Sequence, residues 1–318
     1  MNKRIISITP INHISGVVDR LEAIGDLTII EDPSHEELLD VVNNFDAIFT
    51  NPNKSKIFLD KKIFEKAPNL KVICTASTGT NHMNKIDMSN HSIDLLSLTE
   101  EREIINTISS TAEHALALTM SAVRNVPQSF NSVLEGEWNY EKFIGRQLDK
   151  LTVGIIGYGR LGSKYAEYIL SLGSEVLVYD PYKSVNHPNI LQKENLDSIF
   201  ELSDIISIHV HVNEETTDLI NSSLLKKAKK DLIIVNTARG EVINERDLID
   251  FLESNPESKA ALDVLADEIV SRKQSEILNF VNNSQQIIIT PHVGGMTKEA
   301  QEIAYNHAAE MLSQYFNE

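Results

Sequence analysis

The stretch "LTVGIIGYGRLG" (residues 151–162) decides the fold of this chain. An apolar run typical of a buried strand leads into G-x-G-x-x-G at Gly157, Gly159 and Gly162, and a helical pattern follows. In this motif the first glycine permits a tight turn, the second lets the backbone approach a pyrophosphate, and the third lets the helix pack on the strand. The start of the helix then presents free N–H groups to the phosphates. A tight turn that binds no ligand is the alternative.

Asp180 strengthens the nucleotide interpretation. It ends the next predicted strand, "EVLVYD" (175–180), close to the spacing of about 20 residues expected for an acidic residue that binds the adenosine ribose. A carboxylate at this position repels a 2′-phosphate, so the pattern favours NAD over NADP. Lys183, three residues later, leaves that preference open.

Short β-branched runs alternate with helical patterns along most of the chain. Such alternation predicts βαβ units around parallel sheets, and hence an α/β protein with two doubly wound domains. One helix is predicted over 105–125 and ends near Pro127. The predicted strands are 4–9, 27–30, 46–50, 70–77 and 93–98 in the first part, and 151–156, 175–180, 204–210, 231–237, 258–264 and 286–290 in the second.

Charge and composition restrict the partners and the location. The 318 residues carry a formal net charge of −17 and no stripe of basic residues, which argues against nucleic acid or an anionic membrane as partner. Cys74 is the single cysteine and fits a reducing compartment. No apolar run is long enough for a signal peptide or a membrane span, so we expect a cytoplasmic protein.

Three polar residues follow predicted strands in the second part, where open α/β sheets place their ligands: Arg239, Glu268 and His292. A histidine can donate the proton that a keto group needs on reduction, and a carboxylate can orient its ring. A guanidinium can bind a substrate carboxylate. Each residue alone also fits a solvated loop or turn, and Asp267 competes with Glu268 for the same role.

Several motifs in the same order resemble the D-isomer-specific 2-hydroxyacid dehydrogenases, in particular the 3-phosphoglycerate dehydrogenase branch. The resemblance covers nearly the whole chain. The motifs are "APNLKVICTASTGTNHMNKID" (67–87), "STAEHALALTM" (110–120), "GIIGYGRLG" (154–162), "VNTARGEVI" (235–243), "ALDVLADE" (261–268) and "TPHVGGMTKEA" (290–300).

The resemblance implies roles for individual residues. Arg239 would bind substrate, Glu268 would orient the ring of His292, and His292 would be the acid and base. The loop at Ser77, Thr78 and Gly79 would take the substrate carboxylate on its backbone N–H groups, although an ordinary glycine turn is the alternative. NAD would be bound by Gly157, Tyr158, Gly159, Arg160, Leu161, Gly162, Asp180, His209, Val210, Thr237, Ala238, Asp263, Gly294 and Gly295.

The substrate itself is less well indicated. "TNPNKSKIF" (50–58) follows a predicted strand and would place Asn53 and Lys54 where Lys54 meets a phosphate or a second acidic group. A solvated loop lysine explains the same residues equally well. No motif assigns a metal ligand.

The resemblance also implies the domain organisation. Residues 1–101 with 296–318 would form a flavodoxin-like substrate domain, residues 102–295 a Rossmann NAD domain, and the active site would lie in the cleft between them. The helix at 105–125 would join a homodimer. Because the chain ends soon after the last predicted helix, we expect no appended regulatory domain. Two departures from the family pattern are Ile269 and His211, each at a usual proline.

The predicted activity is reversible reduction of a 2-keto acid to a D-2-hydroxy acid with NAD as cofactor. One alternative is an NAD-sensing protein like the corepressors that resemble this family. Another is a dehydrogenase of the same fold with an unusual donor such as formate or phosphite.

Overall fold

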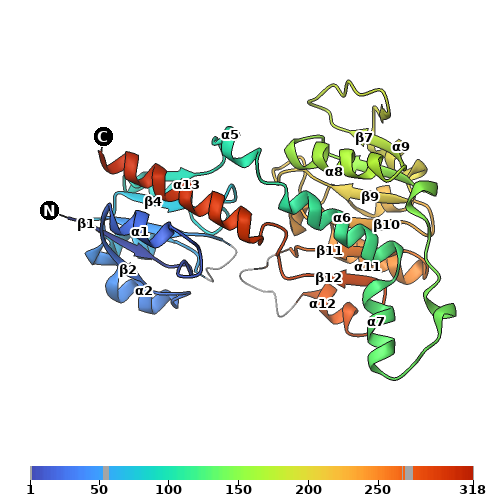
Figure 1. The fold of residues 1–318 in the computed structure, drawn as a ribbon, viewed down its shortest axis with the longest axis horizontal. Helices are drawn as coiled ribbons and strands as arrows, with labels where there is room; N and C mark the ends of the chain where they lie inside the picture. Colours follow the sequence, from blue (N-terminus) through green and yellow to red (C-terminus); the bar gives the residue numbers. More distant parts are fainter. Residues whose placement is uncertain (1, 53–56, 267, 269–274, 318) are drawn as a thin grey trace. The chain divides into compact units, whose positions relative to one another are not determined.

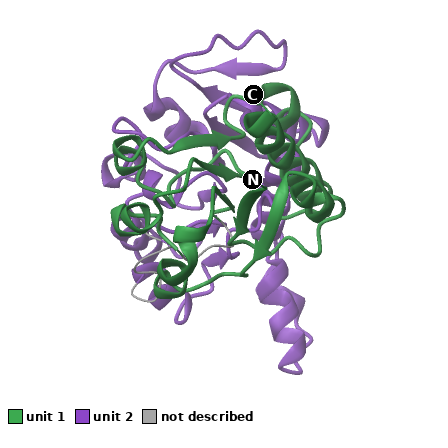
Figure 2. Cartoon of the chain, turned by 90° about the vertical axis from the view of Figure 1, so that its left-hand side faces the viewer, with its two compact units in different colours: residues 1–108, 296–318 green, residues 109–295 purple. Residues whose placement is uncertain are grey.

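The computed structural model describes residues 2–52, 57–266, 268 and 275–317. The chain forms two compact units, residues 1–108 with 296–318 (unit 1) and residues 109–295 (unit 2), as Figure 2 shows. The first unit continues to residue 108, whereas the boundary expected from the sequence was 101/102. Residues beyond it stay with unit 1 because α5 (Arg102–Ile105) buries Ile105 in the core of that unit, with Ile108 packed against it.

Unit 1 contains one parallel sheet of five strands in the order β2-β1-β3-β4-β5 (Figure 1). Neighbouring strands are in register through pairs such as Ile6 with Ile48 and Ile48 with Ile73. The strands are β1 (Lys3–Ser7), β2 (Gly25–Ile29), β3 (Ala47–Thr50), β4 (Val72–Thr75) and β5 (Asp94–Ser97).

Helices cover both faces of this sheet because successive strand residues point to opposite sides. Ile5 and Phe49 pack with α1 (Val17–Glu22) and α13 (Lys298–Asn317). Ile6 and Ile48 pack with the helices of the other face. Those are α2 (His35–Val41), η1 (Val42–Asn44), α3 (Lys61–Lys66) and α4 (Lys85–Asn90).

Unit 2 contains a parallel sheet of seven strands in the order β12-β11-β10-β9-β6-β7-β8. From β6 the strands are added on one side as β7 and β8, and then on the other side as β9 to β12. Such sheets bind ligands at this change in strand order, between β6 and β9. The edge strand β8 was not predicted from the sequence. The strands are β6 (Thr152–Ile156), β7 (Glu175–Tyr179), β8 (Ile190–Gln192), β9 (Ile205–Ile208), β10 (Ile233–Asn236), β11 (Lys259–Leu262) and β12 (Ile287–Ile289).

Two helices, α6 (Ser110–Val123) and α8 (Arg160–Ser171), pack on one face of the unit 2 sheet with Ile155 and Val235. The other face packs against α9 (Leu196–Leu202), α10 (Ser222–Leu225), α11 (Glu245–Ser254) and α12 (Glu276–Val281). The remaining elements are α7 (Val126–Leu134), η2 (Tyr140–Phe143), η3 (Leu148–Lys150) and η4 (Gly240–Val242). None of the helices in the described ranges is long and apolar enough to cross a membrane.

The prediction of a single helix over 105–125 is wrong in its bounds. The segment contains the last residue of α5 and the whole of α6, and Asn125 adopts a left-handed conformation before α7. Pro127 lies in the first turn of α7, a position where proline costs no helical hydrogen bond. It begins the next helix rather than ending the previous one.

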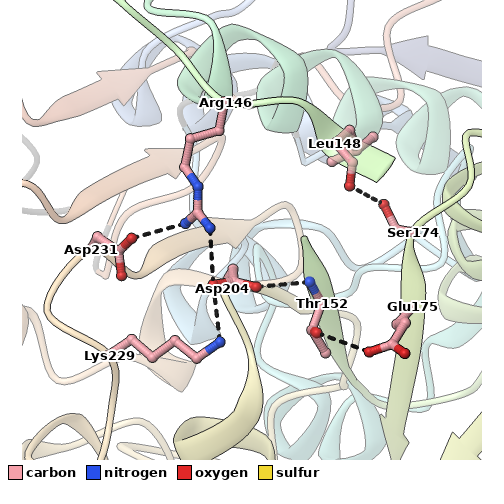
Figure 3. Close-up of polar contacts among 8 residues, drawn as sticks. All are labelled: Arg146, Leu148, Thr152, Ser174, Glu175, Asp204, Lys229 and Asp231. Carbon is pink, nitrogen blue, oxygen red and sulfur yellow. Dashed lines mark hydrogen bonds and ion pairs between the residues drawn. The ribbon is translucent and has the colours of Figure 1, made fainter. Parts of the chain in front are cut away.

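A cluster of charges holds together the amino ends of the unit 2 strands (Figure 3). The carboxylate of Asp204, just before β9, accepts hydrogen bonds from the backbone N–H of Thr152 (2.8 Å), from Lys229 (3.0 Å) and from Arg146 (3.3 Å). Arg146 also binds Asp231 at 2.9 Å. This network lies at the edge of the sheet opposite to the glycine-rich turn, so it supports the fold rather than the site.

Candidate active site

The glycine-rich turn joins β6 to α8 in the geometry that the sequence predicts. Gly157 has φ +91°, a left-handed conformation that favours glycine. A Cβ atom at Gly162 would lie 2.0 Å from the carbonyl oxygen of Gly157, so the fold itself requires glycine there. A Cβ atom at Gly159 would have no atom within 4 Å. Contacts within the chain therefore do not explain why residue 159 is a glycine. The open space beside it, which we call the phosphate cradle, is suited to a pyrophosphate.

Asp180 binds this turn directly. Its Oδ2 accepts the backbone N–H of Tyr158 at 2.8 Å, and its Oδ1 accepts that of Tyr182 at 2.9 Å. A carboxylate has about four lone-pair directions, so these two bonds leave room for ribose hydroxyl donors. The acidic group is therefore held at the end of β7, beside the turn.

His209 lies beneath the turn as a neutral side chain. Its Nε2 is 2.9 Å from Oγ of Ser207, and its ring packs on Tyr165 with 5.1 Å between ring centroids. Burial lowers the pKa of His209 to about 3, so the ring carries no charge at neutral pH. The oxygens of Tyr165 and Thr119 lie 2.7 Å apart, which extends a buried polar chain to α6.

His292 and Glu268 form a hydrogen-bonded pair. Nδ1 of His292 lies 2.7 Å from Oε2 of Glu268, and Oε1 of Glu268 accepts the backbone N–H of Leu265 at 2.9 Å. The carboxylate therefore has a fixed orientation. Nε2 of His292 has no hydrogen-bond partner within the described part of the chain and is available to exchange a proton.

Arg239 follows β10, the neighbour of β11, and η4 begins at the next residue. Asn236 closes its turn by accepting the N–H of Ala238 (2.9 Å) and donating to the carbonyl of Arg239 (2.8 Å). A Cβ atom at Gly240 would lie 1.9 Å from the carbonyl carbon of Leu265, so this turn packs directly on the segment that leads to Glu268. Arg239 and Glu268 thus lie on two loops in contact.

Asp263 anchors the loop that carries His292. The Asp263 side chain is only 1% exposed and accepts hydrogen bonds from Oγ1 of Thr290 (2.5 Å) and from the N–H groups of Val293 (2.9 Å) and Gly294 (2.8 Å). Nε2 of His114 lies 3.3 Å from Oδ1. Burial by itself would raise the pKa of Asp263, but these donors, His114 first, outweigh it and hold the pKa below its usual value. Asp263 is therefore an ionised buried group.

Residues 116–294 match the model of the family described as "D-isomer specific 2-hydroxyacid dehydrogenase, NAD binding domain". This chain belongs to that family. The dehydrogenase family therefore accounts for the turn at Gly157, Gly159 and Gly162 as part of an NAD-binding domain, in agreement with the expectation from sequence.

Similar proteins place the chain near the phosphoglycerate dehydrogenase branch of the family. A D-3-phosphoglycerate dehydrogenase of Synechocystis is 32% identical over 93% of this chain and 51% of its own length. That of Archaeoglobus fulgidus is 34% identical over 84% of this chain and 49% of its own length. The chain thus spans about half the length of the curated relatives that it matches.

Solved structures agree on the fold. The D-lactate dehydrogenase of Aquifex aeolicus, complexed with NAD and lactic acid, superposes with a TM-score of 0.82 at 23% identity. The match covers 99% of this chain and 96% of that one. The chain therefore shares its fold with that structure.

Most residues that the family resemblance singled out in unit 2 follow the carboxyl ends of its strands, at one edge of the sheet. Thr237 also has a buried Oγ1 that lacks a hydrogen-bond partner in the described chain, and such an atom suits a bound cofactor. The set comprises Gly157, Tyr158, Gly159, Arg160, Leu161 and Gly162 after β6, Asp180 after β7, His209 and Val210 after β9, Thr237, Ala238 and Arg239 after β10, Asp263 and Glu268 after β11, and His292, Gly294 and Gly295 after β12.

The expected substrate loop lies in unit 1, after β4. The N–H of Gly79 donates to Oγ of Ser77 at 2.9 Å, and the carbonyl of Thr78 accepts from Thr99 at 3.1 Å. A carboxylate bound here must compete with Ser77 for the N–H of Gly79. Asn53 and Lys54, the other expected substrate residues, lie outside the described residues.

Sequence reasoning gave no role to several residues that shape the site. Glu245, at the start of α11, accepts the N–H of Ala266 at 2.8 Å and so holds the loop before Glu268. Burial raises the pKa of Glu245. Asn236, Thr290 and His114 likewise bind the loops described above. The motifs quoted for the family contain the last three, but no local pattern indicates their partners.

Proposed function

We propose that the chain is an NAD-dependent dehydrogenase that interconverts a D-2-hydroxy acid and a 2-keto acid. The observation that carries this proposal is the pairing of His292 with Glu268 at 2.7 Å, on the sheet edge that also carries the open turn at Gly159. An imidazole with one nitrogen fixed by a carboxylate and the other free is suited to proton transfer.

In the proposed reaction the nicotinamide cofactor, when bound, supplies a hydride to the carbonyl carbon of the keto acid. The π-electron pair moves to the carbonyl oxygen, which takes a proton from Nε2 of His292. His292 becomes neutral, and Glu268 keeps its hydrogen bond to Nδ1. Arg239 binds the substrate carboxylate with its guanidinium. The reverse reaction runs the same steps backwards, with neutral His292 as the base.

Unit 2 is proposed to hold the cofactor, and unit 1 to bind the substrate through Ser77, Thr78 and Gly79. Asp180 supports NAD over NADP because its fixed carboxylate repels a 2′-phosphate. Asp263 is proposed to lie near the nicotinamide through the loop that it anchors, since its 1% exposed carboxylate already accepts from Thr290, Val293 and Gly294. His209 and Val210 would border the adenosine, and the loop at Gly294 and Gly295 the nicotinamide.

The substrate is proposed to be 3-phosphoglycerate with 3-phosphohydroxypyruvate, or a related hydroxy acid. The names of the relatives in Synechocystis and Archaeoglobus fulgidus support this choice. Lys54 remains the proposed contact for a phosphate or a second acidic group. We further propose that the protein is cytoplasmic, which its free and buried Cys74 supports.

A homodimer is also proposed. Its interface was expected on the helix at 105–125, but α6 buries its apolar residues within unit 2. Exposed apolar side chains gather instead on α7 and the segment after it, where monomers rarely leave so many in water. They are Val126, Phe130, Val133, Leu134, Trp138, Tyr140 and Ile144.

The test is NADH and NADPH oxidation with a panel of 2-keto acids that includes 3-phosphohydroxypyruvate, hydroxypyruvate, glyoxylate, pyruvate and longer branched acids. We expect NADH to be preferred and at least one acid to be reduced to its D isomer. Preference for the phosphorylated acid would support the narrower substrate proposal, and turnover of only unphosphorylated acids would reject it. No turnover of any acid with tight NADH binding would reject the enzymatic proposal in favour of a cofactor-sensing protein.

A further inference from the structure

His114 connects α6 to the loop that carries His292. Its Nε2 lies 3.0 Å from Oγ1 of Thr290 and 3.3 Å from Oδ1 of Asp263. We propose that His114 is a positioning residue that fixes the turn of His292 through Thr290 and Asp263. The consequence for turnover rests on the proposed function, whereas the consequence for the turn does not.

The hydrogen bonds fix where the protons lie. The hydroxyl of Thr290 has one proton and donates it to Oδ1 of Asp263, with 2.5 Å between the oxygens. Toward His114 that hydroxyl can therefore only accept, so Nε2 of His114 carries a proton. The direction of donation runs from His114 to Thr290 and from Thr290 to Asp263. An apolar side chain in place of His114 would leave Thr290 free to turn away from the carboxylate.

Asp263 transmits this constraint to His292. Its carboxylate accepts the N–H groups of Val293 and Gly294, and its carbonyl accepts the N–H of His292 at 2.8 Å. His292 has φ +55°, a conformation that a residue other than glycine keeps only where its surroundings impose it. The bonds from the N–H groups of His292, Val293 and Gly294 to Asp263 impose it here.

The ring of His114 also packs against this turn. A Cβ atom at Gly294 would lie 3.7 Å from Cδ2 of His114 and 3.0 Å from Oδ2 of Asp263. The His114 side chain is 20% exposed, so its place on α6 does not result from complete burial in the core. Its polar contacts go to Thr290 on the His292 loop and to Asp263, which anchors that loop, and this favours positioning over packing as its role.

The test compares His114→Gln with His114→Leu, two substitutions of similar helix propensity. Glutamine can place an N–H donor close to the position of Nε2, whereas leucine cannot, and both residues are good helix formers, so α6 is kept. Thr290→Val removes the same link from the other end. His35→Leu is the matched control, because it removes a His–carboxylate pair of similar length, with Asp60 at 3.1 Å, from unit 1.

The first readout needs no turnover. The His292 ring signal in the ¹H–¹³C NMR spectrum, assigned by its loss in His292→Ala, is expected to shift in His114→Leu and Thr290→Val. It should stay in place in His114→Gln and His35→Leu. An unmoved His292 signal in folded His114→Leu would overturn the proposal. This holds even if the wild type reduces no 2-keto acid, a result that would reject the proposed function instead.

The second readout is kinetic. We expect kcat with the best keto acid to fall roughly 10²-fold in His114→Leu, the scale of a small misplacement at a reacting centre. The primary isotope effect from deuterated NADH should rise, since slower hydride transfer becomes rate-limiting, whereas a mere loss of folded protein would leave it unchanged. His114→Gln should stay within a few-fold of the wild type. Equal turnover in the leucine and glutamine variants would contradict the proposal.

Discussion

Glu268 and His292 lie on loops that follow neighbouring strands, β11 and β12, and their side chains meet at 2.7 Å. Glu268 is also fixed from behind by the N–H of Leu265. The pair therefore has one orientation before any substrate binds, which is the condition for efficient proton transfer.

Glu268→Gln keeps a hydrogen-bond acceptor for His292 but removes the negative charge that stabilises its protonated form. We expect kcat for keto acid reduction to fall by about 10–10²-fold, while the Kd for NADH changes little. Steady-state kinetics and NADH fluorescence titration check both values. An unchanged kcat would show that the carboxylate has no part in proton transfer.

Gly159→Ala should separate cofactor binding from stability. The position has no atom near a Cβ, so the Tm of the free protein should change little, whereas the Kd for NADH should rise at least 10-fold because the methyl group occupies the phosphate cradle. Gly162→Ala is the matched control. Its Cβ would lie 2.0 Å from a backbone oxygen, so that variant should lower the Tm itself. Equal NADH binding in Gly159→Ala and wild type would reject the cradle.

Asp204 makes stability depend on pH. Burial tends to raise the pKa of Asp204, but the bonds from Thr152, Lys229 and Arg146 lower it overall. A group with a lowered folded pKa stabilises the native state above its unfolded pKa, about 3.9, and loses that contribution as the pH falls through the folded value. Asp204→Asn should therefore cost about 2 kcal/mol at pH 7, or roughly 4–8 °C in Tm.

Calorimetry at pH 7 and at about pH 3 checks this prediction, since the difference between Asp204→Asn and wild type should shrink at the lower pH. Asp197→Asn is the control. Its pair with Lys227 is half exposed and should contribute less than about 1 kcal/mol. A Tm difference that is independent of pH would contradict the assignment of the effect to ionised Asp204.

Phe130→Glu combined with Leu134→Glu should disrupt the proposed dimer. The two side chains are 62% and 70% exposed, so charges there cost the isolated chain little but are costly to bury in an interface. Sedimentation velocity should show a dimer for the wild type and a monomer for the double variant. Ile86→Glu, at an equally exposed position of unit 1, should leave the dimer intact. A wild-type monomer at micromolar concentration would contradict the proposal.

Strands and glycines were well predicted from sequence because their signals are local. The run from Leu151 to Gly162 predicts both the strand and the turn. The structure requires glycine at 157 and 162 for the tight turn and the close helix packing that the motif implies. The edge strand β8 was missed because its three residues, Ile190–Gln192, carry no alternating pattern. The bounds of α6 were missed mainly at its start, because apolar residues continue from Ile105 through Ile108 although α5 ends at Ile105 and α6 begins only at Ser110.

The side chains of the candidate site that follow strands were predicted from the sequence. The residues that fix these side chains by hydrogen bonds were not. Arg239, Glu268 and His292 each follow a strand, and parallel strands bring such positions to one edge. His114 contacts Thr290, which is 176 residues away in the sequence, and no local pattern predicts such a contact. Residues whose role depends on long-range contacts become visible only once α6 is seen against the loop after β12.

His292→Ala tests the central claim most directly. We expect kcat for the best 2-keto acid to fall by about 10²–10⁴-fold, because the proton donor is lost, while NADH binds with nearly its wild-type Kd. Stopped-flow kinetics and fluorescence titration on the same preparation measure both. A variant that binds NADH and still reduces the keto acid at the wild-type rate would contradict the account.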